Sequence, residues 1–310
     1  MKKRKQHYVW EHYLKAWAVD GHVWCRRGES VFRASTENVA HRRDFYRLKE
    51  MSSFDLECVE MLISQMPERR RDLVRGWIPH FQLFFDIKRA WEATGRHNRK
   101  MEEFLDTTIN NLEEDLHESI EQEAIPLLAA LRDGDAGVLN DDASFIAFSR
   151  FIATQSLRTP GVARRVVERA GATIPGFNVE ASWGLLRTIL ATNVGANLYA
   201  GRGNLRLVFL DTVAGLELVT GDQPIVNVRG SQAGGDPPTE LEYYYPLMPT
   251  RAVLLNFDYS SALRERRTLT EAEGEAYNRM IFVKSDEQIY ASSERPLVDI
   301  HTPAANSPRP

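Results

Sequence analysis

The segment HYVWEHYLKAW, residues 7–17, contains two histidines, two tyrosines and two tryptophans in eleven residues. Chain ends are usually polar and poorly ordered, so this density of aromatic side chains predicts that the amino terminus is docked into the fold. On a helix, four of these residues recur at spacings of three and four and form one apolar stripe, namely His7, Trp10, Leu14 and Trp17. We therefore expect a short first helix that packs this stripe against the core.

A short β element follows this segment. Residues 23–25 and 30–34 are β-prone runs on either side of an Arg-Gly-Glu loop at residues 27–29, which is typical of a hairpin. Residues 44–46 are expected to form a third strand. Because an isolated hairpin is only marginally stable in water, we expect this element to join or cover a sheet built from the carboxy-terminal part of the chain.

Apolar spacing, capping signals and breakers divide the middle of the chain into expected helices at about residues 52–66, 68–96, 101–133, 142–159 and 179–199. Ser52 and Asp55 have the spacing of a capping box at the start of the first. Pro79 is expected to kink or break the second. The third has one apolar stripe and an otherwise acidic surface, which we interpret first as a solvated face and second as a partner-binding face.

After Gly203 the apolar period changes from 3.6 towards 2. Strands are expected at residues 205–210, 216–220, 225–228, 243–247, 253–257 and 288–290, with a helix that begins at Thr270. The fold class predicted is α+β, with a short amino-terminal helix and hairpin, a large central helical region and a carboxy-terminal, mostly antiparallel sheet. We expect one domain over residues 1–300 with a helical insert at about residues 53–200, and a disordered tail at residues 301–310.

Composition narrows the classes of protein that remain. The 310 residues have a formal net charge of −4, which gives no overall attraction to nucleic acid or to an anionic membrane. Cys25 and Cys58 are the only cysteines, so a disulfide framework is excluded and a reducing, cytoplasmic setting is expected. No run reaches the roughly 18 apolar residues of a membrane span. No phosphate loop, dinucleotide fingerprint or zinc-protease helix is present.

Polar residues at three places in the chain are candidates for a site, each with a structural alternative. His7 lies four residues before Glu11, so the carboxylate would orient the imidazole or share a metal with it; the alternative is a hydrogen-bonded core histidine. Asp222, between Gly221 and Pro224, is either a fixed acid, base or ligand at the end of a strand, or the residue that shapes a turn.

The third place is the end of the fourth expected helix. Gln155 and Arg158 extend its apolar face with an amide and a guanidinium. The functional interpretation is that Arg158 holds a carboxylate or phosphate in a pocket. The alternative is that it binds the last carbonyl groups of its own helix.

Taken together, these segments resemble the bacterial domain-of-unknown-function family 4238. The resemblance rests on HYVWEHYL, the DFY segment at residues 44–46, the RTP helix end at residues 158–160 and the GDQP turn before YYYPL, and it extends over roughly residues 6–290. Trp10 stands where many members have proline, and Gly221 where serine is common. The resemblance implies relatedness and no particular reaction. The positions it implies to be shared are His7, Tyr8, Tyr13, Leu14, Phe45, Tyr46, Arg158, Asp222 and Pro224.

Charged residues are costly to bury for stability alone, so these positions favour a function. The leading hypothesis is a hydrolase acting on nucleotide or nucleic-acid phosphates, in which His7 is a general base or metal ligand, Asp222 orients it or binds a divalent cation, and Arg158 steadies a phosphate. The side chains expected to bind the small-molecule or nucleic-acid ligand are Tyr8, Tyr13, Tyr46 and Gln155. The rival hypothesis is a non-enzymatic sensor or partner-binding component of a defence or stress system.

Overall fold

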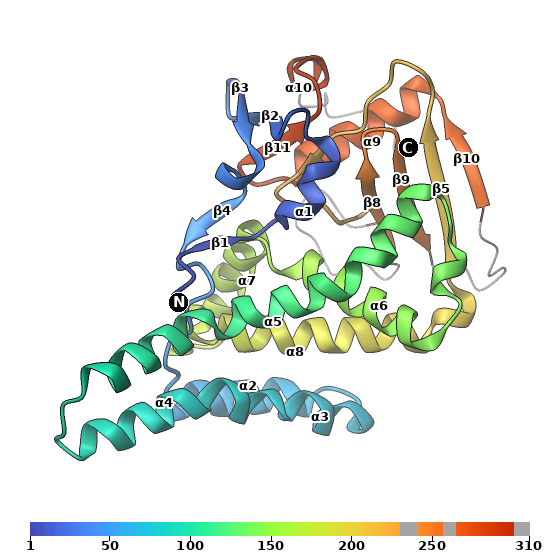
Figure 1. The fold of residues 1–310 in the computed structure, drawn as a ribbon. Coiled ribbons are helices and arrows are strands. Elements are labelled where there is room, and N and C mark those ends of the chain that lie inside the picture. The colour runs from blue at the N-terminus through green and yellow to red at the C-terminus, as the bar shows by residue number, and fades with distance from the viewer. Residues whose placement is uncertain (230–240, 257–264, 301–310) are drawn as a thin grey trace.

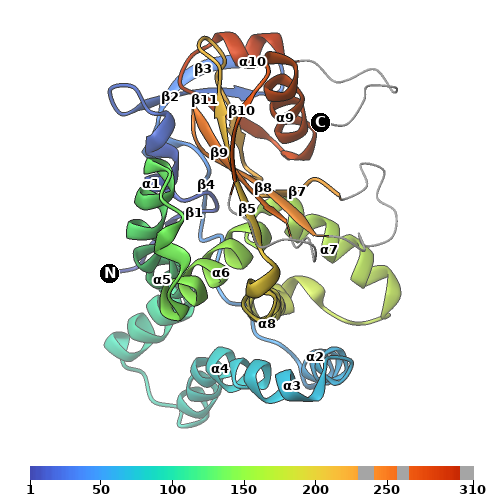
Figure 2. The same ribbon diagram turned by 90° about the vertical axis from the view of Figure 1, so that its right-hand side faces the viewer.

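The computed structural model describes residues 1–229, 241–256 and 265–300. The expected tail at residues 301–310 and the end of the strand expected at residues 253–257 lie outside the described residues. The elements of this α+β fold form three tiers, with the sheets in the first, a group of long helices in the second and a group of helices from residues 53–93 in the third (Figures 1 and 2).

The second and third tiers together form the predicted central helical region. The second contains α5 (Arg99–Asp133), α6 (Asp142–Leu157), α7 (Pro160–Thr173) and α8 (Val179–Ala200). The third contains α2 (Ser53–Ser64), α3 (Glu68–Arg75) and α4 (Trp77–Ala93), which contact α8. The capping box of α2 at Ser52 and Asp55 is present, as predicted. The break expected at Pro79 falls instead at Gly76, which leaves the proline in the first turn of α4, where its missing N–H costs little.

A five-stranded sheet packs on the second tier. Its strand order is β10-β5-β9-β8-β7, and every neighbouring pair is antiparallel except β10 and β5. The strands are β5 (Arg206–Thr212), β7 (Val226–Asn227), β8 (Glu242–Met248), β9 (Arg251–Asn256) and β10 (Glu265–Leu269). The charged strand β10 was not predicted from the sequence.

The amino-terminal hairpin joins carboxy-terminal strands, as predicted. β2 (His22–Arg27) and β3 (Ser30–Ser35) form a four-stranded sheet with β11 (Gln288–Ala291) and β6 (Thr220–Gly221), in the order β3-β2-β11-β6. The third strand predicted at residues 44–46 is wrong: the strand is β4 (His41–Arg43), and residues 44–46 form a turn.

The amino terminus is docked into the fold, but not as a single helix. His7 lies in β1 (Lys5–His7), which pairs with β4, so it does not share a helical stripe with Leu14. Trp10 has an extended backbone with ψ of 125°, and helix α1 (Glu11–Leu14) begins after it and continues as the 3-10 turn η1 (Lys15–Trp17). Trp17 is fully buried in a core shared with α5, α6 and the five-stranded sheet.

The remaining elements complete the first tier and its connections. α9 (Glu271–Lys284) begins at Thr270 as predicted, with a capping box between Thr270 and Glu273. α10 (Arg295–Asp299) follows β11. Short 3-10 turns occur at η2 (Thr36–Asn38), η3 (Gly137–Leu139) and η4 (Arg202–Asn204).

Candidate functional site

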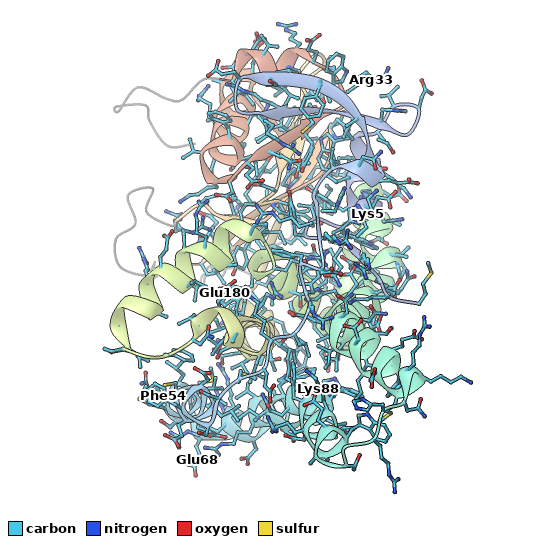
Figure 3. The ribbon with its side chains drawn as sticks, turned by 90° about the vertical axis from the view of Figure 1, so that its left-hand side faces the viewer. Lys5, Arg33, Phe54, Glu68, Lys88 and Glu180 are labelled. Atoms are coloured by element: carbon cyan, nitrogen blue, oxygen red, sulfur yellow. The ribbon has the colours of Figure 1, made fainter. Side chains whose placement is uncertain are left out.

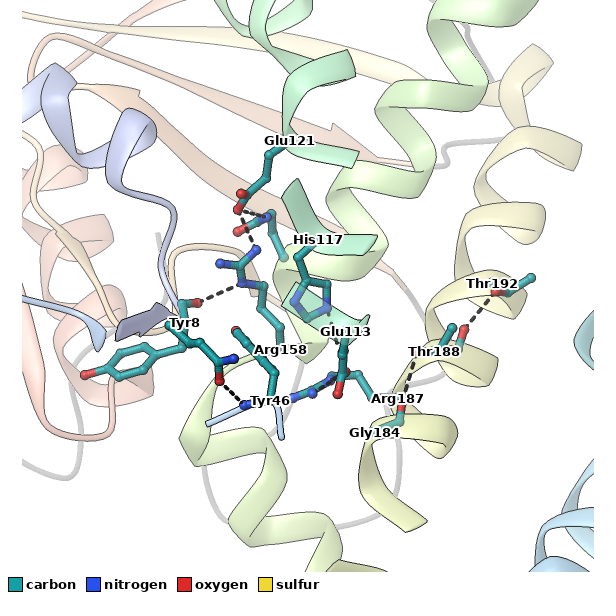
Figure 4. Close-up of polar contacts among 12 residues, drawn as sticks. Tyr8, Tyr46, Glu113, His117, Glu121, Arg158, Gly184, Arg187, Thr188 and Thr192 are labelled. Atoms are coloured by element: carbon teal, nitrogen blue, oxygen red, sulfur yellow. Dashed lines mark hydrogen bonds and ion pairs between the residues drawn. The ribbon is translucent and has the colours of Figure 1, made fainter. Parts of the chain in front are cut away.

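Arg158, which follows the last turn of α6, is 1% exposed and joins the amino-terminal strand to α5. Its guanidinium donates to the backbone carbonyl of Tyr8 at 3.2 Å from Nε and to the carboxylate of Glu121 (Figure 4). It also donates to the backbone carbonyl of His7. The amide of Gln155 donates to the same Glu121 oxygen at 3.3 Å. The carboxylate that Arg158 holds is therefore one from the protein itself, and Gln155 shares it.

A second buried ion pair lies beside the first on α5. Arg187 of α8 donates through Nε to Glu113 at 2.9 Å, and its guanidinium carbon lies 4.8 Å from the centre of the Tyr46 ring. His117, one turn after Glu113, packs edge-on against Tyr46 at 4.5 Å between ring centres. Burial, with the two arginine charges, lowers the pKa of His117 well below its ordinary value, so this imidazole is neutral.

His7 presents its backbone, not its ring, to this cluster. Its carbonyl accepts from Arg158 and from the Tyr46 hydroxyl at 3.2 Å, while its ring lies edge-on against His41 at 5.4 Å. Burial lowers the pKa of His7 to about 4, and the neighbouring His41 adds to the effect. Nε2 is buried and has no hydrogen-bond partner among the described residues.

Asp222 lies in the turn after β6. Its carboxylate accepts three backbone N–H groups where the chain enters β11: Asp286 at 2.7 Å, Glu287 at 2.6 Å and Gln288 at 3.0 Å. Burial raises the pKa of Asp222 to about 6, although the three amide donors oppose that rise. The aspartate thus fixes the start of β11.

The predicted ligand-binding tyrosines are all buried. The Tyr8 hydroxyl accepts from the side chain of Gln288 at 3.1 Å. The Tyr13 hydroxyl bonds to Thr220 at 2.7 Å and donates to the Pro246 carbonyl at 2.8 Å. Tyr8, Tyr13 and Tyr46 are each 1% exposed. Of the three, only Tyr46 lines a cavity, which lies between the turn after β4 and helices α5, α7 and α8.

A cavity of about 480 Å³ lies between the turn after β4, the start of α7, the start of α8 and α5. Glu180, one of its lining residues, lies in Figure 3 between the part of the molecule where Lys5 is labelled and the outer tier where Phe54 is labelled. Its apolar lining residues include Phe45, Phe81 and Trp183. Neither His7, Arg158 nor Asp222 lines it.

The charged side chains of this cavity are mostly cationic. Five cationic residues line it, against two carboxylates: Arg42, Arg47, Lys49, Arg164 and Arg187, against Glu113 and Glu180. The ion-pair partners of the five are Glu287, Asp106, Glu180, Asp286 and Glu113, respectively. Three of these partners do not line the cavity, so its lining carries a formal excess of three positive charges.

Sequence reasoning did not identify this cavity. Four of the five cations are between 37% and 57% exposed, and in the sequence they are indistinguishable from solvated surface charges. The one available signal was the segment RRDFYRLK at residues 42–49, in which four cations surround two adjacent aromatic residues.

The acidic surface of α5 is largely neutralised within the chain. Lys2 pairs with Asp106 at 2.8 Å, and Lys3 pairs with Asp115 at 2.8 Å and with Glu118. The basic amino-terminal residues therefore lie along this helix. This leaves less unpaired negative charge for the partner-binding face of the rival hypothesis.

Comparison with known proteins gives a family. The sequence pattern of the DUF4238 family, described as a protein of unknown function, matches residues 5–183, more than half of the chain. The chain belongs to this family. The match includes His7, Tyr46 and Arg158 and ends before Asp222. Searches of curated proteins and of solved structures found no match.

Two further findings concern the described residues alone. No group of three or more histidine, cysteine, aspartate or glutamate side chains among them is arranged to hold a metal ion. None of the helices they form combines the length and the apolar character needed to cross a membrane.

Proposed function

We propose that this DUF4238 protein binds a small anionic ligand of the nucleotide class in the cavity between β4, α5, α7 and α8. The observation that carries the proposal is the lining of five cationic and two anionic side chains. An excess of one sign of charge in the lining of a cleft attracts ligands of the opposite sign. A ligand in this cavity would fit the rival hypothesis of a non-enzymatic sensor. It would not require a partner bound to the acidic face of α5.

The size and walls of the cavity support the same ligand class. Its volume of about 480 Å³ suits a single small molecule, since ligand sites commonly occupy about 300–1,000 Å³. Apolar and aromatic side chains make up part of its lining, and the guanidinium carbon of Arg42 lies 5.9 Å from the centre of the Phe45 ring. A ligand with an aromatic base and a phosphate matches both parts of this lining.

Hydrolysis of a bound phosphate ester is the second candidate, and Glu113 favours it. This carboxylate lines the cavity, and burial raises its pKa, as in groups that exchange protons with a substrate or water. The test is release of inorganic phosphate from nucleotides by the wild type and by Glu113→Gln. Hydrolysis predicts release by the wild type alone, whereas a pure binding function predicts none from either protein.

The binding proposal is tested by calorimetry with AMP, GMP, pyrophosphate and citrate, with adenosine as the uncharged comparison. We expect at least one anion to bind the wild type and to raise its melting temperature, because a ligand that binds only the native state stabilises it. The variant Lys49→Gln/Arg164→Gln should weaken binding by at least about ten-fold, since hydrogen bonds to charged groups contribute about 1.5–3 kcal/mol each.

The matched control is Arg99→Gln, which removes a cation that lies outside the cavity and is 90% exposed. It should leave the affinity unchanged. Absence of binding by every anion of the panel, or equal weakening by the control, would refute the proposed function.

The cytoplasmic location expected from the sequence belongs to the same proposal. Cys25 and Cys58 are both free and buried, which is compatible with a reducing compartment.

A further inference from the structure

The turn held by Asp222 carries two of the cavity's ion-pair partners. Asp286, whose N–H donates to Asp222, pairs through its carboxylate with Arg164 of α7. The next residue, Glu287, also donates its N–H to Asp222 and pairs with Arg42 of β4. The buried carboxylate of Asp222 therefore fixes the backbone of two consecutive residues, Asp286 and Glu287. The side chain of each of these anchors pairs with one arginine of the cavity lining.

We propose that the phosphate group of the ligand binds between Arg42 and Arg164, and that Asp222 is the positioning residue that sets these two guanidinium groups. The proposal rests on the proposed function of the cavity and adds which end of it receives the phosphate. Asp222 itself contacts no ligand, since it is 2% exposed and does not line the cavity.

The two arginines suit a phosphate because of their position in the fold and because they keep N–H donors for a further acceptor. They belong to different elements, β4 and α7, and their anchors are consecutive residues, so both guanidinium groups lie next to the same turn. A guanidinium has five N–H donors in a planar fork, and a single carboxylate partner leaves donors for a second acceptor. The side chains of Arg42 and Arg164 are 42% and 57% exposed, which leaves them accessible to a ligand.

Burial of Asp222 has a cost that a surface turn would not incur. Its pKa is raised because the buried carboxylate is poorly solvated, and its three amide partners only partly offset this. A turn residue left in solvent would hold the chain less firmly but at lower cost. A buried carboxylate at this position is explained if residues 286 and 287 must be placed accurately for a reason other than stability. We infer that the reason is the placement of the two arginines with which their side chains pair.

Glu217 provides a matched control at the other end of β11. Its carboxylate accepts the N–H of Ser292 and, at 3.3 Å, that of Ser293, so it also fixes a chain segment next to this strand. No cavity-lining arginine pairs with Ser292 or Ser293 in the part of the chain that the structure describes. Replacing Glu217 should therefore reduce stability without moving the cavity's cations.

The experiment measures the affinities of AMP, GMP, pyrophosphate and adenosine for the wild type, Asp222→Asn, Glu287→Gln and Glu217→Gln. For Asp222→Asn we expect binding of the anions to weaken about ten-fold, because the arginines lose their fixed positions, while weak binding of adenosine stays unchanged. Glu287 is 45% exposed, so this position should tolerate substitution. Glu287→Gln should also weaken binding of the anions. Glu217→Gln should lower the melting temperature and leave the affinities unchanged.

Combining Asp222→Asn with Arg42→Gln separates positioning from a general effect on stability. If Asp222 acts through the arginines, the double variant binds the anions little worse than Arg42→Gln alone. Fully additive losses, unchanged anion binding by Asp222→Asn, or equal weakening by Glu217→Gln would overturn the inference while the cavity's function stands. If the wild type binds none of the anions, the proposed function falls, and this inference with it.

Discussion

Replacement of Arg158 by methionine should destabilise the protein strongly, because the guanidinium is the partner of two buried acceptors and one part-buried acceptor. Methionine keeps much of the side-chain length and removes all the donors. Glu121 loses its charged partner and keeps only Gln155, and the Tyr8 carbonyl loses its bond from Arg158, whereas the His7 carbonyl keeps the Tyr46 hydroxyl.

The expected loss in free energy of unfolding is about 3–5 kcal/mol, the usual cost of breaking a buried ion pair by removing one partner. Glu121 is the group left behind, and burial already raises its pKa in the intact pair. Glu121→Gln removes that unpaired charge, so the double variant Arg158→Met/Glu121→Gln should recover a large part of the loss. The coupling between the two positions is expected to be about 2 kcal/mol or more.

A second pair between the same two helices provides the control. Arg150 of α6 pairs with Glu123 of α5, and their side chains are 45% and 48% exposed. Exposed pairs contribute about 0–1 kcal/mol, so Arg150→Met should cost little. Urea unfolding followed by tryptophan fluorescence and circular dichroism measures all variants. A loss at Arg158 no larger than that at Arg150, or a coupling near zero, would refute the reasoning.

Three further predictions concern other parts of the chain. Burial raises the pKa of Glu114 from 4.5 to about 7, so stability falls as the pH rises from about 4.5 to about 7, where this carboxyl ionises in the unfolded chain before it does in the folded one. Glu114→Gln should remove this contribution, up to about 3 kcal/mol, from the pH dependence of urea unfolding. Parallel pH profiles for the two proteins would contradict this. A Cβ at Gly221 would collide with the Ser285 hydroxyl, so Gly221→Ala should lower stability by about 1–3 kcal/mol, with partial recovery in Gly221→Ala/Ser285→Ala. Deletion of residues 1–18 should prevent soluble expression because it removes core side chains, whereas deletion of residues 1–5 should be tolerated, and a folded protein without residues 1–18 would show that this end is an appendage.

Local signals were enough to predict most helices. The capping boxes at Ser52 and Thr270 place the starts of α2 and α9, and Gly134 in the left-handed conformation ends α5 where the sequence predicted. No helix was predicted where α7 lies. Pro160 was interpreted only as the end of α6, yet it is also the first residue of α7, a position that needs no N–H donor and suits the fixed φ of proline.

The strands β10 and β1 were not predicted, because the sheet environment and not the local sequence decides them. β10 has the sequence ERRTL and lies at the edge of its sheet, where charged side chains are favoured and no apolar alternation marks the strand. His7 was placed on a helix because its spacing to Trp10 fits one, but it pairs with His41 on β4. Pairing between distant segments carries no local periodicity to detect.

The candidate site was the hardest part to predict, and the reason is physical. Sequence reasoning selected Arg158 and Asp222 because buried charges are costly, and both are indeed buried, at 1% and 2% exposed. Burial also means that the charged groups of these two residues are already bonded to partners within the protein. They can therefore position other residues but are poorly placed to contact a ligand. The accessible cations of the cavity come from β4, the turn after it and α7, and no single segment brings them together. The fold brings Arg42 of β4 and Arg164 of α7 into the lining of one cavity, which is why the residues that would meet a ligand are those that resemble ordinary surface charge in the sequence.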